Sequence, residues 1–331
     1  MRAMLMTAPG GPEVLRMAEV PEPNLTRPTQ VKLRLRAAGV NPVDAKLRAR
    51  GVFYPDGLPA ILGCDGAGEV VEAGAESGLQ IGDRVAFCHG GLGAAPGSYA
   101  EFKVIEAMET AVIPAGVDFE QAAALPLVLI TAWESLMDRA RLQPGQTVLV
   151  LGGAGGVGHI AIQLARLRGV HVLATAGTPE KAAFVRRQGA SGVVQYASEG
   201  LVEAVMRLTG GRGADVVFDT VGGPLFAQAV ACAGYAGDVV TLLEPPADAP
   251  WKEARERNLR VGFDLMLTPM LRDLPEARAH QVNILRQGLE MLADGRLSVH
   301  VDEVLPLEEA AEAHRRVAAG HTQGKLVLAM G

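Results

Sequence analysis

The chain has 331 residues, 49% of them hydrophobic and 21% charged, so it can bury sizeable cores, and its length favours about two domains. Its formal net charge is −6, with no long basic run, which argues against nucleic acid or an anionic membrane surface as a partner. No segment has the character of a signal peptide or a membrane span, and three cysteines are too few for a disulfide framework, so a cytoplasmic protein is expected.

Residues 1 to about 120 are predicted to be mostly β, because short apolar runs alternate with glycine and proline turns. Those runs are Val31–Leu35, Glu69–Val71 and Arg84–Phe87. The segment Val40–Asp44 is predicted to end a strand and begin a short helix, capped by Asn41 or Asp44. Gly63–Gly68 and Pro96–Phe102 are predicted turns, and the second of them leads into a strand.

From about residue 121 the pattern changes to alternating helices and strands, which predicts a parallel, doubly wound sheet. Gln121–Met137 is a predicted helix that Pro126 kinks or restarts. Thr178 is a good N-cap, followed by a proline and an acid in the first turn, and Pro224–Cys232 is a further predicted helix. The predicted strands are Val148–Leu151, Val170–Ala176, Asp215–Asp219, Val239–Leu243 and Leu259–Leu265.

The segment Thr147–Arg168 organises this second part of the chain. Its apolar strand is followed by a glycine turn and by a helix with one apolar face. Between strand and helix the chain reads G-x-G-x-x-G, and these glycines allow a tight turn, close approach of a pyrophosphate and close packing of helix on strand. A dinucleotide site is therefore predicted, with the pyrophosphate on free N–H groups at the helix start. Its residues are Gly153, Gly155, Gly156, Val157 and Gly158.

The last part of the chain adds predicted helices near Ala277–Ala293 and Leu307–Ala319 and a final strand, Lys325–Ala329. Neither this tail nor residues 1–121 looks complete alone, so the tail is expected to pack back onto the first domain. The predicted domains are residues 1–121, 122–265 and 266–331, the first and last forming one domain.

Six motifs give the chain a resemblance over nearly its full length. They are A-A-G-V-N-P-V-D at Ala37–Asp44, L-G-C-D-G-A-G at Leu62–Gly68, G-S-Y-A-E-F at Gly97–Phe102, A-A-A-L-P at Ala122–Pro126, G-G-A-G-G-V-G at Gly152–Gly158 and D-T-V-G-G at Asp219–Gly223. With these motifs the chain resembles the medium-chain dehydrogenase/reductase superfamily, in its zinc-free quinone oxidoreductase branch, which includes the zeta-crystallin type. The resemblance implies an α/β fold: a GroES-like, mostly β catalytic domain and an inserted Rossmann domain, with the site in the cleft between them.

The resemblance also bears on zinc. Alcohol dehydrogenases of this superfamily carry a Cys where this chain has Asn41, and a His-Glu pair where it has Cys64 and Asp65. These two residues cannot supply three protein ligands with an open fourth position. His89 is a nearby alternative ligand or simply a solvated side chain, and no metal is expected.

For the cofactor, NADPH is expected over NADH. Gly169–Pro179 contains no Asp or Glu, whereas an NAD-specific site places an acid there that would repel the 2′-phosphate of NADPH. Related quinone reductases use a Lys and a Tyr at the positions of Lys181 and Tyr196, and hydroxyls of Thr175 and Thr178 are close in sequence. The alternative is that Lys181 is a solvated helix residue and Tyr196 packs at a strand edge. The remaining candidate cofactor-binding residues are Val221 and Leu243.

One position departs from that pattern, because the bacterial relatives bring an Arg to the same phosphate from a turn where this chain has Gly320–Gln323.

For catalysis, the resemblance implies that Asn41 and Thr131 lie near the nicotinamide and donate hydrogen bonds to an acceptor carbonyl. Tyr54 resembles a family tyrosine that bonds an oxygen or delivers a proton, while Lys46 replaces another. The alternatives are that Asn41 only caps a helix and that Tyr54 belongs to a turn.

The leading functional hypothesis is therefore an NADPH-dependent reductase of quinones. Reduction of the C=C bond of an enone or enal is a close second, since it needs the same hydride geometry. A zinc alcohol dehydrogenase, a non-catalytic NADPH-binding protein and an AU-rich RNA binder are further alternatives, the last disfavoured by the acidic charge. Relatives pair through the edge strand of the Rossmann sheet, here Arg260–Leu265, so a homodimer is expected.

Overall fold

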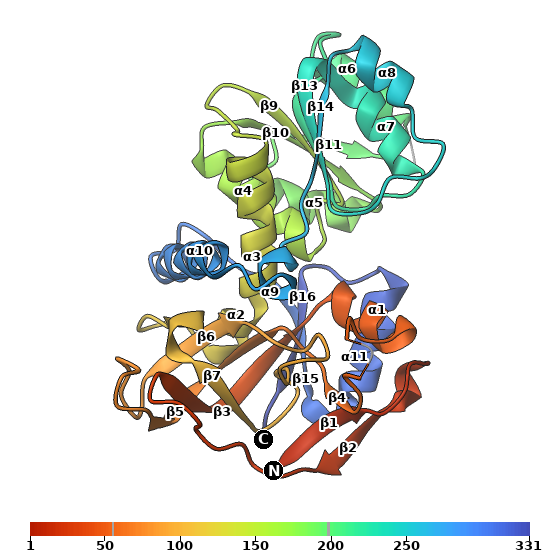
Figure 1. Cartoon of the computed structure of the whole chain (residues 1–331). Coiled ribbons are helices and arrows are strands. Elements are labelled where there is room, and N and C mark those ends of the chain that lie inside the picture. The colour runs from red at the N-terminus through yellow and green to blue at the C-terminus, as the bar shows by residue number, and fades with distance from the viewer. Residues whose placement is uncertain (55, 197–198) are drawn as a thin grey trace. The chain divides into compact units, whose positions relative to one another are not determined.

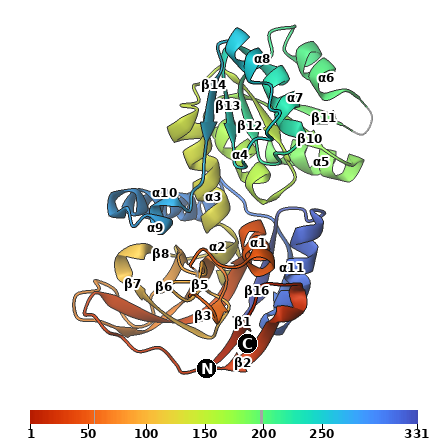
Figure 2. The ribbon, with the colours of Figure 1, turned by 45° about the vertical axis from the view of Figure 1, so that its right-hand side comes forward.

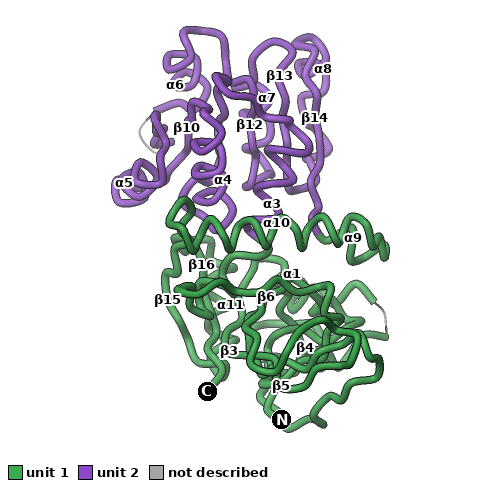
Figure 3. The backbone as a smooth tube through the Cα atoms, turned by 90° about the vertical axis from the view of Figure 1, so that its left-hand side faces the viewer, with its two compact units in different colours: residues 1–127, 267–331 green, residues 128–266 purple. Residues whose placement is uncertain are grey.

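The computed structural model describes residues 1–54, 56–196 and 199–331. The chain folds as two compact units, which Figure 3 colours separately. Unit 1 comprises Met1–Leu127 and Leu267–Gly331, and unit 2 comprises Val128–Met266. None of the described helices combines the length and the apolar character that crossing a membrane requires.

Unit 1 is built on two sheets. The smaller has the order β2-β1-β4, and the larger has the order β15-β16-β3-β5-β6-β8, with β7 also paired to β3. The long strand β3 is central because it pairs with β16, β5 and β7, and its residues are buried along most of its length. The strands are β1 (Arg2–Met6), β2 (Leu15–Glu19), β3 (Gln30–Val40), β4 (Ala60–Ile61), β5 (Asp65–Ala73), β6 (Arg84–Cys88), β7 (Phe102–Glu106), β8 (Thr110–Val112), β15 (Val301–Pro306) and β16 (Lys325–Ala329).

The C-terminal strand β16 pairs antiparallel with β3, with Leu326 opposite Val40, and this pairing joins the two chain ends in one unit (Figure 1). The tail therefore packs back onto the N-terminal part, as predicted. The helices of unit 1 are α1 (Pro42–Arg50), α2 (Phe119–Ala124), α9 (Thr268–Leu271), α10 (Pro275–Ala293) and α11 (Ala310–Ala319), with 3-10 turns at Pro12–Val14, Ala107–Glu109 and Leu307–Glu309. Helix α2 packs on β3 and β5.

The predicted turn at Gly63–Gly68 is wrong, because β5 already begins at Asp65. Two of its glycines belong to the strand for packing reasons. A Cβ at Gly66 would collide with the ring of Phe87, and one at Gly68 would collide with the carbonyl oxygen of Arg34. The glycines therefore allow neighbouring groups to approach β5 closely.

Unit 2 contains a parallel six-stranded sheet with the order β11-β10-β9-β12-β13-β14, which confirms the predicted doubly wound architecture. Its strands are β9 (Thr147–Leu151), β10 (His171–Ala176), β11 (Gly192–Gln195), β12 (Ala214–Asp219), β13 (Ala233–Thr241) and β14 (Arg260–Phe263). Its helices are α4 (Gly156–Leu167), α5 (Pro179–Gln188), α6 (Leu201–Leu208), α7 (Leu225–Cys232) and α8 (Trp251–Glu256). Helix α3 (Pro126–Trp133) leads into this unit and continues as a π-helical segment, Glu134–Arg139.

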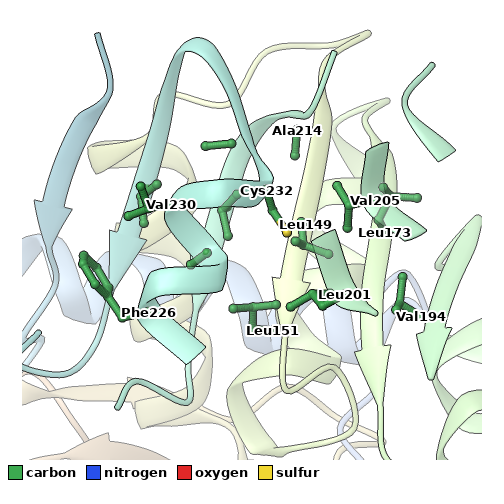
Figure 4. Close-up of a cluster of buried hydrophobic side chains, with 14 of the residues drawn as sticks. Leu149, Leu151, Leu173, Val194, Leu201, Val205, Ala214, Phe226, Val230 and Cys232 are labelled. Atoms are coloured by element: carbon green, nitrogen blue, oxygen red, sulfur yellow. The ribbon is translucent and has the colours of Figure 1, made fainter. Parts of the chain in front are cut away.

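Helices α4 and α5 pack together, and α6 packs on α7, which in turn contacts α8 (Figure 2). The core beneath α6 and α7 joins wholly buried side chains of several elements, among them Leu149, Val205 and Phe226 (Figure 4). Completely burying one such side chain contributes about 1.5–3 kcal/mol. The sheet is thus a rigid base for the loops at its edges.

Sequence patterns missed the short elements β1, β2, β4, β8, β11, α6, α8, α9 and β15. They also placed the start of β13 too late, at Val239 instead of Ala233. The first residues of β13 include the exposed Tyr235 and Ala236, whose φ is +59°. This irregular start lacks the continuous apolar run that marks a buried strand.

Candidate active site

The glycine turn after β9 has the geometry of a phosphate cradle. Gly152 has a φ of +76°, in the left-handed region that favours glycine. A Cβ at Gly158 would collide with the carbonyl oxygen of Gly152, so a glycine is needed for α4 to begin this close to the strand. A Cβ at Gly155 would meet only that same oxygen, at 3.3 Å. The first N–H groups of α4 lack partners within the helix and can therefore bind a phosphate.

The predicted cradle residues Gly153, Gly155, Gly156, Val157 and Gly158 all lie in this turn or in the first turn of α4. Thr175, buried at the end of β10, ties the turn to the neighbouring strand, because its hydroxyl accepts the N–H of Gly152 at 2.9 Å.

The turn between β10 and α5 gathers the predicted phosphate-binding groups. The hydroxyl of Thr178 caps α5 by accepting the N–H of Lys181 at 3.2 Å, as predicted. The hydroxyl of Tyr196 lies 2.6 Å from the position that a Cβ would take at Gly177. Tyr196 therefore reaches the same turn from the end of β11, while its side chain is largely exposed.

Glu180 also lies in this first turn of α5, and sequence reasoning did not consider it as a site residue. Hydrogen bonds from its own N–H and from the Thr178 hydroxyl hold the pKa of this carboxyl below its ordinary value. A carboxylate is thus present one residue before Lys181, although Gly169–Pro179 is free of acids.

Val221 and Leu243 follow the carboxyl ends of β12 and β13. The buried carboxylate of Asp219 shapes this region by accepting the N–H groups of Val221 at 3.0 Å and Gly222 at 2.8 Å. Leu243 packs against Gly222, where a Cβ would come within 2.6 Å of its side chain. Strands β9, β10, β12 and β13 run parallel, so the predicted cofactor-binding residues gather at the carboxyl ends of these strands, which is the usual place for a nucleotide.

The predicted catalytic residues belong to both units. Thr131 is a buried residue of α3 in unit 2. In unit 1, Tyr54 and Lys46 are exposed. Partial burial and the neighbouring Arg50 lower the pKa of the Lys46 ammonium.

Asn41 has no exposed surface and lies in a buried polar triad with Asp65 and Lys325. Its Nδ2 donates to Asp65 Oδ2 at 2.9 Å, and its Oδ1 accepts from Lys325 Nζ. Lys325 also donates to the carbonyl of Val40 at 3.1 Å, and its Nζ lies 3.6 Å from Asp65 Oδ2. Sequence reasoning missed Lys325, because it lies 284 positions from Asn41 and carries no local motif.

A second buried group surrounds the start of α1. Asp44 Oδ2 accepts the N–H of Asn41 at 2.8 Å, which confirms the predicted cap, and accepts the Tyr99 hydroxyl at 3.2 Å. The same hydroxyl lies 3.2 Å from His314 Nε2. Burial raises the pKa of Asp44 to about 7 and lowers that of His314 to about 3. Burial therefore shifts both groups toward their uncharged forms.

The residues considered as zinc ligands have other surroundings. Cys64 is wholly buried, and burial raises the pKa of its thiol well above the ordinary value. Asp65 Oδ1 accepts the N–H of Leu127 at 3.0 Å, so both carboxylate oxygens of Asp65 have protein donors. Burial, Lys103 and Arg278 lower the pKa of His89. Within residues 1–54, 56–196 and 199–331, no three His, Cys, Asp or Glu side chains form a group suited to a metal.

Comparison with known proteins agrees with this arrangement. Residues 27–115 match the alcohol dehydrogenase GroES-like domain, and residues 188–328 match the family described as zinc-binding dehydrogenase. Quinone oxidoreductase of Pseudomonas aeruginosa is 35% identical over 321 residues, which cover 96% of each chain. An alcohol dehydrogenase superfamily protein from Novosphingobium aromaticivorans is 34% identical, with a TM-score of 0.91 over 100% of both chains. Escherichia coli quinone oxidoreductase, solved in complex with NADPH, is 29% identical, with a TM-score of 0.88 over 99% and 100% of the chains.

The GroES-like unit, the parallel sheet and its glycine turn define an oxidoreductase that binds a nicotinamide cofactor. The chain belongs to the medium-chain dehydrogenase/reductase superfamily, in its quinone oxidoreductase branch. The glycine turn fits the dinucleotide, since a Cβ at Gly155 would meet only the carbonyl oxygen of Gly152 and the first N–H groups of α4 can bind a pyrophosphate.

Proposed function

We propose that this protein transfers hydride from NADPH to a quinone or another conjugated carbonyl compound. In the overall reaction NADPH, a proton and a quinone give NADP⁺ and a hydroquinone, so two electrons and two hydrogens reach the acceptor. The observation that carries the cofactor part is the turn before α5, where Thr178 accepts the N–H of Lys181 and the Tyr196 hydroxyl reaches Gly177.

This turn suits the 2′-phosphate of NADPH for electrostatic reasons. A phosphate here would face an ammonium, a phenol hydroxyl and the positive end of α5. Glu180 opposes this attraction by its negative charge, and Lys181 supplies the compensating positive charge. The preference for NADPH over NADH therefore depends on Lys181.

A bound nicotinamide supplies the hydride, and the protein's own groups orient and polarise the acceptor. An amide nitrogen carries two hydrogens, and the bond to Asp65 uses one of those on Asn41. We assign the second to the acceptor oxygen, where a neutral donor stabilises charge that develops as hydride arrives. Asn41 is buried, so an acceptor contacts it only when the residues that cover it move aside. Tyr54 is exposed and is the proposed proton donor, with Thr131 as a further donor to the acceptor.

We infer that the reaction needs no zinc, because the available ligand atoms do not fit the metal. A catalytic zinc takes three protein ligands, usually thiolates, imidazoles or carboxylates. Here Asn41 offers a neutral amide, and Asp65 binds Asn41 and Leu127 beside the Lys325 ammonium. Elemental analysis should find well under one zinc per chain, and one tightly held zinc would contradict the inference.

We also propose a homodimer that forms through β14. This strand is the last in the order of the unit 2 sheet, so one of its edges offers N–H and C=O groups to a partner. Phe263 and Leu265 expose 57% and 52% of their surface there, which is apolar area that a two-fold partner would cover. Light scattering at micromolar concentration should give twice the chain mass, and a monomer would contradict the proposal.

Reduction of a conjugated C=C bond is the second candidate, since the same carbonyl polarisation serves both reactions. The test is NADPH oxidation with quinones, enones, enals, aldehydes and simple ketones under one set of conditions. Quinones or conjugated carbonyls should be reduced, and simple ketones should not, because the proposed donors are weaker than a Lewis acid. Turnover limited to enones or enals would favour C=C reduction, and no turnover with any acceptor would favour a binding protein.

A further inference from the structure

Three strands of unit 1 bring Asn41, Asp65 and Lys325 together. Asn41 directly follows β3, Lys325 is the first residue of β16, and Asp65 is the first residue of β5. Strand β3 lies between the other two, since it pairs with β16 near Val40 and with β5 where Gly39 faces Asp65. Strand β16 therefore places the Lys325 cation beside the end of β3 from one side, and β5 places the Asp65 anion there from the other side.

The two charged groups bind opposite ends of the Asn41 amide. An ammonium has only donors and a carboxylate only acceptors. Lys325 Nζ therefore requires the Oδ1 end of the amide, and Asp65 Oδ2 requires the Nδ2 end. Rotating the amide by half a turn would place NH₂ against an ammonium and oxygen against a carboxylate. All three side chains are at most 3% exposed, so water cannot replace the lost hydrogen bonds, and the reversed orientation is strongly unfavourable.

The triad thus fixes where the remaining Nδ2 hydrogen of Asn41 points. We propose that Lys325 is a positioning residue for the hydride step, which holds the Asn41 amide with its NH₂ group toward the acceptor. This inference rests on the proposed function, since it assigns Lys325 a role in the same reaction. Lys325 also donates to the carbonyl of Val40, so it fixes the backbone before Asn41 as well.

Lys103 offers a matched control within the same unit. It is also a lysine of a β-strand and is also 3% exposed. Its Nζ donates to the backbone carbonyl of Pro96 and lies 5.4 Å from the centre of the Phe87 ring, and it makes no hydrogen bond to Asn41 or Asp65 in the described structure. Burial lowers the pKa of Lys103 to about 7, so replacing it reports the general effect of losing a buried lysine side chain.

The experiment compares Lys325→Met and Lys103→Met by thermal melting, by NADPH binding and by turnover with the best acceptor. Lys325→Met should lower kcat at least about tenfold, the scale of losing one preorganised donor, while the dissociation constant of NADPH changes less than about threefold. Lys103→Met should keep kcat within about threefold. A folded Lys325→Met that keeps the kcat of Lys103→Met would overturn the proposal.

A double-mutant cycle separates positioning from a general effect on the fold. With Asn41→Ala in the background, Lys325→Met should lower kcat less than about twofold further, because no amide remains to be oriented. An undiminished loss in that background would overturn the proposal. If Lys325→Met does not fold, Lys325→Gln replaces it, which keeps a donor but removes the charge. It should lose at least about threefold in kcat, and a kcat equal to that of the wild type would equally overturn the proposal.

Failure of the proposed function is distinguishable in the same experiment. If wild-type protein oxidises no NADPH with any acceptor, the proposed reaction is wrong. If the wild type is active and Asn41→Ala is equally active, the assignment of Asn41 to the acceptor is wrong. The positioning role of Lys325 is rejected separately, when Asn41→Ala loses turnover and folded Lys325→Met does not.

Discussion

The proposed cofactor site of unit 2, at the carboxyl ends of its parallel strands and here called the cofactor edge, differs in construction from the polar triad of unit 1 formed by Asn41, Asp65 and Lys325. At the cofactor edge, the groups offered to the ligand are backbone N–H groups and exposed side chains next to glycine turns. In the triad, charged side chains from three strands are buried and bind each other. The cofactor edge presents hydrogen-bonding groups that a ligand can use. In the triad the side chains bind one another, and only the second Nδ2 hydrogen of Asn41 remains for an acceptor. Under the proposed function, unit 2 would supply affinity for the cofactor and unit 1 would orient the acceptor.

The largest effect is expected when the triad loses its central amide. Asn41→Ala should lower kcat at least about tenfold, because removing one oxyanion donor typically costs about 10²–10³ in rate. The dissociation constant of NADPH should stay within a few-fold, because the proposed partner of Asn41 is the acceptor oxygen and not a group of the cofactor. Steady-state kinetics beside a thermal melt check this. A less stable variant with full turnover would assign Asn41 to the fold alone.

The converse pattern is expected at the cofactor edge. Lys181→Ala should weaken NADPH binding by about 1.5–3 kcal/mol, the scale of a hydrogen bond to a charged group, and leave NADH nearly unchanged. Titration of both cofactors gives the two dissociation constants. Lys252→Ala is a suitable control, because this lysine is highly exposed in α8 and lies near its helix partner Glu256. Equal losses for NADPH and NADH would show that Lys181 supports the fold.

A smaller effect concerns pH and the buried carboxyl of Asp44. Burial raises its pKa to about 7, against 3.8 for the ordinary side chain, so between these values the native state holds a proton that the unfolded state has released. Its stabilising contribution is complete below about pH 4 and is lost as the pH rises through about 7. Asp44→Asn keeps the shape without the titration. The melting temperature of the variant minus that of the wild type should therefore rise between about pH 5 and pH 8, and a constant difference would contradict this.

Much of the fold was predictable because local patterns determine it. The strand before the glycine turn, the Thr178 cap and the final strand all follow from spacing within a few residues. The short elements β4 and β8 were not, since two or three residues carry no periodicity. The glycines of β5 suggested a turn, and only the close approach of Phe87 and Arg34 explains them.

In the candidate site, too, features set by local sequence were predictable, and features set by long-range contacts were not. The glycine turn and the helix start of unit 2 were predictable from one glycine motif, whereas the preference for NADPH, inferred from an absent acid, stays a prediction. Glu180 was overlooked because it lies just past the stretch of chain that the rule considers. The environment of Asn41 was not predictable, because Lys325 reaches it only through the pairing of β16 with β3. Long-range strand pairing of this kind leaves no local signal in a single sequence.

The central claim is that hydride from NADPH reaches an activated carbonyl acceptor. The most direct measurement uses NADPH deuterated at the transferring C4 position and a conjugated enone or quinone that the protein reduces. Direct hydride transfer predicts slower oxidation of the deuterated cofactor and, with an enone, one deuterium in the product at the carbon β to the carbonyl. Reduction at an undiminished rate that leaves no deuterium in the enone product would contradict direct hydride transfer.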